Sequence, residues 1–207
     1  LFRSVPFNQF EAGTIKDLQA QYPTDEALRE LLKEGLAEAG YEYNTLKDVH
    51  IRYTDRTTST LDQARIEYLG QNWEDVLGIT VDVAITNDFT YMSNTDYDLT
   101  LATWNGGAYP SGYLVDLYDA KLGRASLAGY YENAEFQAIL DSAKGVIDPE
   151  KVAEIYEEAE TLLLTDAGSS PIYWADYIYY QQNYVAGIQY GIFSTSIGFA
   201  NAYIVKH

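Results

Sequence analysis

The residues best suited to holding a ligand lie in one stretch, 95–113, which reads TDYDLTLATWNGGAYPSGY. An expected strand ends at Trp104, and Gly106, Gly107 and Tyr109 follow shortly after it. The indole of Trp104 offers a flat apolar wall. The glycines leave backbone N–H and C=O groups open, so an extended peptide could pair with them as an added strand. The same residues also fit a core tryptophan followed by a plain turn, and both interpretations remain open from the residues alone.

Few residues could support catalysis. The only histidines are His50 and His207, so neither a histidine metal site nor a Ser-His-Asp triad with its G-x-S-x-G turn is expected. The chain has no cysteine, and Gly106-Gly107 lacks the lysine and spacing of a phosphate-binding loop. Paired carboxylates remain. The 31 Asp and Glu residues leave a glycosidase, with two carboxylates near aromatic side chains, as the enzymatic alternative.

The charge excludes some partners. There are 31 acidic and 13 basic residues, giving a formal net charge of -18. Nucleic acids and anionic membranes require a basic face, so neither is an expected partner. The 20 tyrosines suit strands, or a binding surface that is apolar yet forms hydrogen bonds. No apolar run reaches the length of about 18 residues that a membrane-spanning helix needs.

The elements that must position these groups alternate between helical and extended patterns. Thr24 caps the first expected helix, Gly40 ends it, and Asp148-Pro149 begins the last one. A helix–strand–helix–strand–strand order over the first half predicts an α/β fold with a mixed sheet flanked by helices. Helices are expected at 24–39, 61–77, 133–145 and 148–164, strands at 49–53, 79–85, 97–104, 171–180 and 201–206, and a loop at 105–113.

Several motifs occur in a recognisable order: a helix ending in AGY, a Trp before LGI, a YD strand ending in Trp, an N-x-E-F helix, and a helix leading to a P-I-Y strand. In this order they resemble the C-terminal half of the family 5 solute-binding proteins. These are the oligopeptide- and dipeptide-binding components of ABC importers. The resemblance covers nearly all of residues 24–207, through the segments 27–42, 64–83, 96–110, 130–143, 153–180 and 202–207.

The resemblance implies one lobe of a two-lobed receptor of the type II periplasmic-binding-protein class, in its peptide-binding cluster. We expect an irregular leader at 1–23, in which one helical turn would fit, and a second ligand-binding lobe at 24–175. Residues 176–207 would then return toward the first lobe, which this sequence would lack. The ligand would lie between the lobes, held mainly by backbone hydrogen bonds.

The resemblance also assigns the ligand contacts. Trp104 matches the pocket tryptophan of the family, and Asn105, Gly106, Gly107 and Tyr109 match the loop that meets the peptide. Family members that bind a free peptide amine place an Asp a few residues after this tryptophan. The aligned residues 105–108 contain no acid, so the resemblance does not carry over recognition of a free amino terminus.

The expected function is therefore extracytoplasmic binding of oligopeptides for uptake, by a periplasmic protein or a cell-surface lipoprotein that works with an ABC permease. We expect no catalytic activity, no metal and no cofactor. A nickel complex, an opine or a sugar remain alternative ligands. A sensory or interaction domain with the same lobe fold remains an alternative function. An isolated lobe with an unpaired apolar face could form a dimer.

Overall fold

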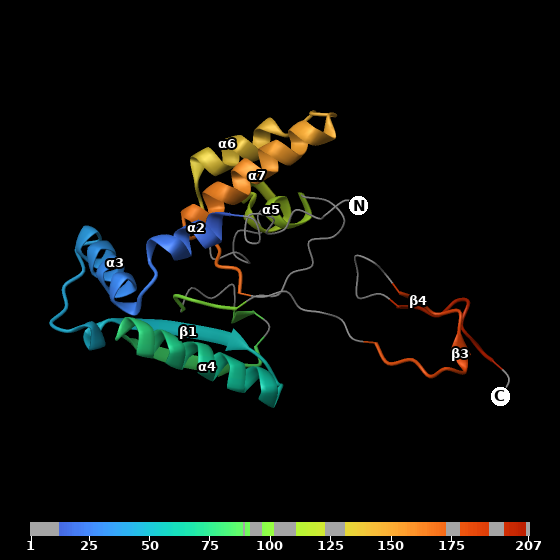
Figure 1. Cartoon of the computed structure of the whole chain (residues 1–207), viewed down its shortest axis with the longest axis horizontal. Coiled ribbons are helices and arrows are strands. Elements are labelled where there is room, and N and C mark those ends of the chain that lie inside the picture. Colours follow the sequence, from blue (N-terminus) through green and yellow to red (C-terminus); the bar gives the residue numbers. More distant parts are fainter. Residues whose placement is uncertain are drawn as a thin grey trace.

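The computed structural model describes most of the chain. It covers residues 13–88, 90–91, 97–101, 111–122, 131–172, 179–190 and 197–205, of which 111–113 are described by their backbone alone. The elements gather into a sheet with its helices, a bundle of helices, and a separate C-terminal segment (Figure 1).

The sheet is built around one parallel β–α–β unit. Strand β1 (His50–Arg56) pairs with β2 (Thr80–Thr86) along its whole length, in the register His50↔Thr80 to Arg56↔Thr86. Helix α4 (Thr60–Leu77) connects the two strands, as parallel pairing requires a crossover. The strands predicted at 49–53 and 79–85 and the helix at 61–77 are confirmed.

The opposite edge of β1 is also paired. Leu99 pairs with Tyr53 in a parallel bridge, and the carbonyl of Leu99 accepts a hydrogen bond from Thr54 N at 3.0 Å. Its own N–H donates to Arg52 O at 3.1 Å. Strand β1 is thus central, with β2 on one side and residues 97–101 on the other. The remainder of the strand predicted at 97–104 lies outside the described residues.

Helix α4 covers one face of this sheet. Ser59 caps it by accepting a hydrogen bond from Asp62 N, and Gly78, with φ of 77°, ends it in the left-handed conformation that favours glycine. Alternate residues of β1 point toward the helix. There Tyr53 packs edge-on against Trp73 with ring centroids 5.2 Å apart. The fully buried members of this core are Val49, Tyr53, Ile66, Ile79 and Val81.

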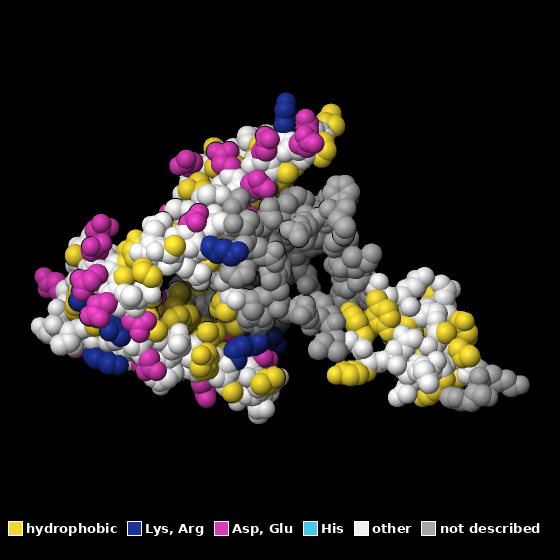
Figure 2. All heavy atoms as spheres, viewed as in Figure 1, with side chains coloured by type: hydrophobic (Ala, Val, Ile, Leu, Met, Phe, Trp, Pro, Cys, Tyr) yellow, Lys and Arg dark blue, Asp and Glu magenta, His cyan; other side chains and the backbone are white. Residues whose placement is uncertain are grey.

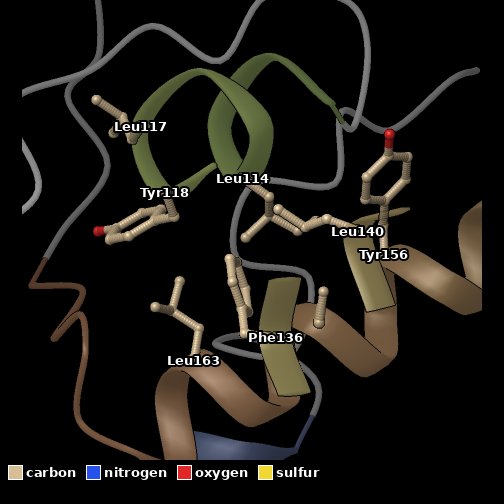
Figure 3. Packing of buried hydrophobic residues seen from close by; sticks show 8 residues of the cluster. Leu114, Leu117, Tyr118, Phe136, Leu140, Tyr156 and Leu163 are labelled. Atoms are coloured by element: carbon tan, nitrogen blue, oxygen red, sulfur yellow. The ribbon is translucent and has the colours of Figure 1, made fainter. Parts of the chain in front are cut away.

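A second core lies among three helices. Helix α5 (Ser111–Tyr118), which runs on through the 3-10 turn Ala120–Leu122, and α6 (Ala134–Ser142) both pack on α7 (Pro149–Thr165). Figure 3 shows the ring of Phe136 in the middle of this cluster. The other buried members are Leu114, Leu117, Tyr118, Leu140, Tyr156, Ala159 and Leu163.

Two further helices complete the body. Helix α3 (Asp25–Glu38) packs on α4 and is capped by Thr24, whose hydroxyl accepts from Ala27 N at 3.2 Å. Helix α2 (Thr14–Gln21) packs on α7. The segment expected to be an irregular leader, 1–23, therefore contains an eight-residue helix among its described residues. A short 3-10 turn at Leu46–Asp48 precedes β1.

The C-terminal segment forms two small antiparallel ladders. Strand β3 (Val185–Ala186) pairs with β6 (Tyr203–Ile204), and β4 (Gln189–Tyr190) pairs with β5 (Ile197–Gly198). Figure 1 shows this segment projecting away from the helices and the sheet. The strand predicted at 201–206 is confirmed only at β6.

Two sequence-based predictions are wrong in the described residues. The strand expected at 171–180 is absent from 171–172 and from 179–180, and its middle lies outside the described residues. The loop expected at 105–113 gives way to α5 from Ser111 onward. The Gly and Pro residues of 105–113 suggested a turn throughout. Burial of Leu114, Leu117 and Tyr118 against α7 favours a helix instead.

Alanine substitution should change stability in opposite directions at two helical glycines, Gly70 in α4, which packs on β2, and Gly35 in α3, which has open space around it. A Cβ at Gly70 would lie 2.7 Å from Val83 Cγ2, so Gly70→Ala must displace this side-chain methyl and should lower the free energy of unfolding by about 1–2 kcal/mol. No atom lies within 4 Å of a Cβ at Gly35 in α3, so Gly35→Ala should raise it by up to about 1 kcal/mol. Urea denaturation of both variants measures the difference. Two changes of the same sign would contradict this packing.

Candidate functional site

The carboxyl ends of the parallel strands meet at one edge of the sheet. Strand β1 ends at Arg56 and β2 at Thr86, and residues 97–101 run in the same direction on the other side of β1. The chain leaves β1 toward β2 and then returns to the opposite side of β1. Ligands of open α/β sheets bind at such a reversal, beyond the carboxyl ends. We call this the carboxyl edge of the sheet.

Asp55 is the buried charged group of this edge. It is 7% exposed, and its Oδ1 accepts hydrogen bonds from Arg56 N at 2.6 Å and from the Tyr91 hydroxyl at 3.5 Å. Burial raises the pKa of the Asp55 carboxyl. The hydrogen bonds from Arg56 N and Tyr91 and the charge of Arg65 oppose that rise.

Tyr91 spans the carboxyl edge. It follows β2 along the chain, and its hydroxyl lies 3.0 Å from Thr100 Oγ1 as well as near Asp55. Its ring also contacts that of Tyr97, with centroids 6.2 Å apart. Burial raises the pKa of the Tyr91 hydroxyl, so this group remains a hydrogen-bond donor at neutral pH. It joins β1, the chain after β2 and residues 97–101.

An ion pair joins β1 to residues 97–101 on the side of Tyr91 that is farther from the carboxyl edge. The Asp98 carboxylate accepts from Arg52 N at 2.8 Å, and its other oxygen accepts from Arg52 Nη2 at 3.1 Å. The hydrogen bond from the Arg52 side chain, together with the one from its backbone, lowers the pKa of Asp98, although partial burial opposes this. This pair anchors the start of residues 97–101 to β1.

The amino end of α4 also opens onto this edge and carries its own acid. Asp62 lies in the first turn, accepts a hydrogen bond from the Thr57 hydroxyl at 3.3 Å, and forms an ion pair with Arg65. A carboxylate in the first turn already balances the positive end of the helix dipole. An anionic ligand group would therefore meet a carboxylate at this helix end.

Of the two histidines weighed for catalysis, the structure describes His50, and His207 lies outside the described residues. His50 begins β1 at the other end of the sheet, where Nδ1 lies 2.9 Å from Asp82 Oδ2. In the part of the chain that the structure describes, no three His, Cys, Asp or Glu side chains gather as a metal site. Nor does any helix there have the length and apolar character to cross a membrane.

The predicted ligand contacts Trp104, Asn105, Gly106, Gly107 and Tyr109 lie outside the described residues, and their roles stay predictions. The described strand ends at Leu101, which packs against the sheet core.

Sequence reasoning missed Asp55, Tyr91 and Thr100. One signal was present: Asp55 continues the alternation of Ile51 and Tyr53, which places its carboxyl on the buried face of β1.

The fold is that of a lobe of the peptide-binding periplasmic proteins. The oligopeptide ABC transporter substrate-binding domain from Bacillus anthracis superimposes with a TM-score of 0.73 and 22% identity, over 91% of this chain and 37% of that one. OppA from Haemophilus influenzae in complex with the peptide RPPGFSPFR gives a TM-score of 0.65 and 22% identity, over 88% and 35%. No family model matches the sequence.

Curated relatives agree with the fold. The oligopeptide-binding protein OppA of Bacillus subtilis is 25% identical over 165 residues, covering 77% of this chain and 29% of OppA. The probable deoxycholate-binding periplasmic protein YgiS of Escherichia coli is 24% identical over 181 residues, covering 86% of this chain and 32% of YgiS. The chain thus spans about a third of the length of these relatives. The resemblance to OppA-type family 5 solute-binding proteins and the α/β fold class are confirmed.

The Asp98–Arg52 contact predicts a pH-dependent loss. Asp98→Asn should lower the free energy of unfolding by about 1 kcal/mol at pH 7, a modest value because both side chains are partly exposed. A lowered pKa means that the carboxylate stabilises the fold above its unfolded-state value of 3.8, and that this stability is lost as the pH falls through the folded-state value. The difference between the variant and the parent should therefore shrink as the pH falls below 3.8 in urea denaturation.

Asp82→Asn is the matched control, because Asp82 is an exposed acid of the same sheet that contacts His50. It should change stability by less than about 0.5 kcal/mol at pH 7. An equal loss in both variants would contradict the role given to Asp98.

Proposed function

We propose that this chain supplies one lobe of an extracytoplasmic solute-binding protein that binds oligopeptides and delivers them to an ABC permease. The observation that carries the proposal is the agreement of fold and relatives over most of the chain. The superposition on the B. anthracis substrate-binding domain covers 91% of it, and the alignment with B. subtilis OppA covers 77%. In this proposal the lobe binds its ligand without chemical change, as the binding proteins named above do.

The ligand would lie at the carboxyl edge. Trp104 follows Leu101 by three residues, so the segment with the predicted contacts begins where the described strand ends. Asn105, Gly106, Gly107 and Tyr109 would offer backbone groups and an aromatic ring to an extended peptide. Binding between two lobes would supply the remaining contacts, which the whole protein provides.

Charge favours neutral or cationic peptides. The chain carries a net charge of -18, and Asp62 occupies the amino end of α4 beside the edge. Such a field raises the local concentration of cations and lowers that of anions. A bile-acid anion, the ligand class named for YgiS, would therefore be disfavoured relative to a peptide such as RPPGFSPFR, which carries two arginines.

The C-terminal segment would pack against the rest of the complete protein. Its side chains include large apolar groups that stay open to solvent, among them Phe199 at 63% and Ile204 at 66% exposure. Figure 2 shows hydrophobic side chains on this projecting segment, and both acidic and hydrophobic side chains on the body. Residues 176–207 would cover these groups by returning to the first lobe. The isolated chain could instead cover them by forming a dimer.

Calorimetry with the complete protein tests this proposal. We expect RPPGFSPFR to bind with micromolar or tighter affinity, deoxycholate to bind far more weakly, and this chain alone to bind the peptide weakly or not at all, because half of the cleft is missing. Tight peptide binding by the chain alone would contradict a two-lobed site. Preference for deoxycholate would overturn the ligand class.

Trp104→Ala tests the predicted contacts within the complete protein. Loss of a stacking wall should weaken RPPGFSPFR binding by about 10-fold or more, since buried aromatic anchors dominate binding sites. Tyr68→Ala is the control, because Tyr68 is an exposed aromatic residue of α4. It should leave the affinity unchanged. Similar effects in the two variants would remove Trp104 from the site.

A further inference from the structure

We infer that Asp55, Tyr91 and Thr100 form a positioning network that fixes the carboxyl edge of the sheet for ligand binding. The inference rests on the proposed function, because it takes the carboxyl edge to be where the ligand lies. The three side chains come from three separate parts of the chain: β1, the residues after β2, and the strand 97–101.

The network begins where backbone pairing stops. Among the described residues, the last backbone hydrogen bond between β1 and 97–101 runs from Thr54 N to Leu99 O at 3.0 Å. Beyond it the Tyr91 hydroxyl lies 3.0 Å from Thr100 Oγ1 and 3.5 Å from Asp55 Oδ1. One phenol thus continues the link between the two strands past the end of the ladder. Without it, the strand that leads into the predicted ligand segment would be held at this end by apolar packing of Leu101.

Burial gives the network its stiffness. Asp55 is 7% exposed, and Arg65 from α4, Tyr53 from β1 and Tyr91 are the charged or titratable groups that act on it. A hydrogen bond to a buried carboxylate is stronger than one in water, and an unpaired buried carboxylate is costly. Asp55 orients the Tyr91 hydroxyl across a long contact of 3.5 Å, and the shorter contact of 3.0 Å links Tyr91 to Thr100.

These residues act on the ligand through the shape of the edge. Asp55 Oδ1 already accepts from Arg56 N at 2.6 Å as well as from Tyr91, and the carboxyl is almost closed off from solvent. It is a poor candidate for direct contact with a ligand. Thr100 precedes Trp104 by four residues, so a shift of its backbone would move the start of the predicted contacts.

Thr100→Val in the complete protein tests the network, with Thr80→Val as the matched control. The Thr80 hydroxyl also makes one hydrogen bond, to Lys47 O at 2.9 Å, but at the other end of the sheet. Two readouts are compared: hydrogen exchange of the Thr54 and Leu99 amides without ligand, and affinity for RPPGFSPFR. Thr100→Val should speed exchange at both amides and weaken binding by about 5-fold each, the size of one lost hydrogen bond. Thr80→Val should leave both readouts unchanged.

Conservative variants distinguish loss of this hydrogen bond from general loss of stability. Thr100→Ser keeps the hydroxyl and should restore both readouts to within about 2-fold of the parent. Tyr91→Phe keeps the ring and removes the contacts of its hydroxyl with both Thr100 and Asp55. Adding Thr100→Val to Tyr91→Phe should therefore have no further effect, because the bond to Thr100 is already lost. Equal effects of Thr100→Val and Thr80→Val, or additive effects of Tyr91→Phe and Thr100→Val, would overturn the inference.

The two proposals fail in different ways. If the parent protein does not bind RPPGFSPFR while Thr100→Val still speeds exchange at Thr54 and Leu99, the proposed peptide ligand is wrong and the network stands as a structural link. If the parent binds the peptide but Thr100→Val changes neither readout, the network is wrong and the proposed function stands.

Discussion

Parallel pairing of β1 on both of its edges is the constraint on which the rest of the structure depends. Helix α4 covers one face of this strand, and the alternation of side chains along β1 places Tyr53 and Asp55 on that face. Parallel pairing with β2 demands a crossover, which α4 supplies. The reversal of the chain around β1 then brings Asp55, Tyr91 and Thr100 to one edge. The site follows from the topology of the sheet.

Acidic side chains lie on the helices of the body, and the C-terminal segment exposes large apolar side chains. A surface this strongly charged keeps the body soluble and repels anions. Exposed large apolar side chains are usual where another part of a protein packs. Both observations suit a lobe that functions as part of a larger receptor.

Local sequence patterns predicted the elements whose signals are local. Ser59 and Gly78 delimit α4, and Asp148-Pro149 begins α7, because capping chemistry operates within a few residues. Helix α5 was missed because its apolar residues find their partners on α7, more than thirty positions away along the chain. The contact of Asp55 with Tyr91 spans 36 positions, so no local pattern could reveal it. The order of the family motifs gave the fold class, since it reflects topology.

Among the residues that the structure describes, the two buried clusters, one between α4 and the sheet and one among α5, α6 and α7, have no buried side chain in common. Each can therefore lose its packing while the other keeps it, and the chain need not melt in a single cooperative step. Trp73 packs against the first cluster and Phe136 lies in the second. A spectroscopic signal from each residue would therefore report the unfolding of its own cluster. In a receptor that opens and closes, such independence would let one part of a lobe yield while another keeps its shape.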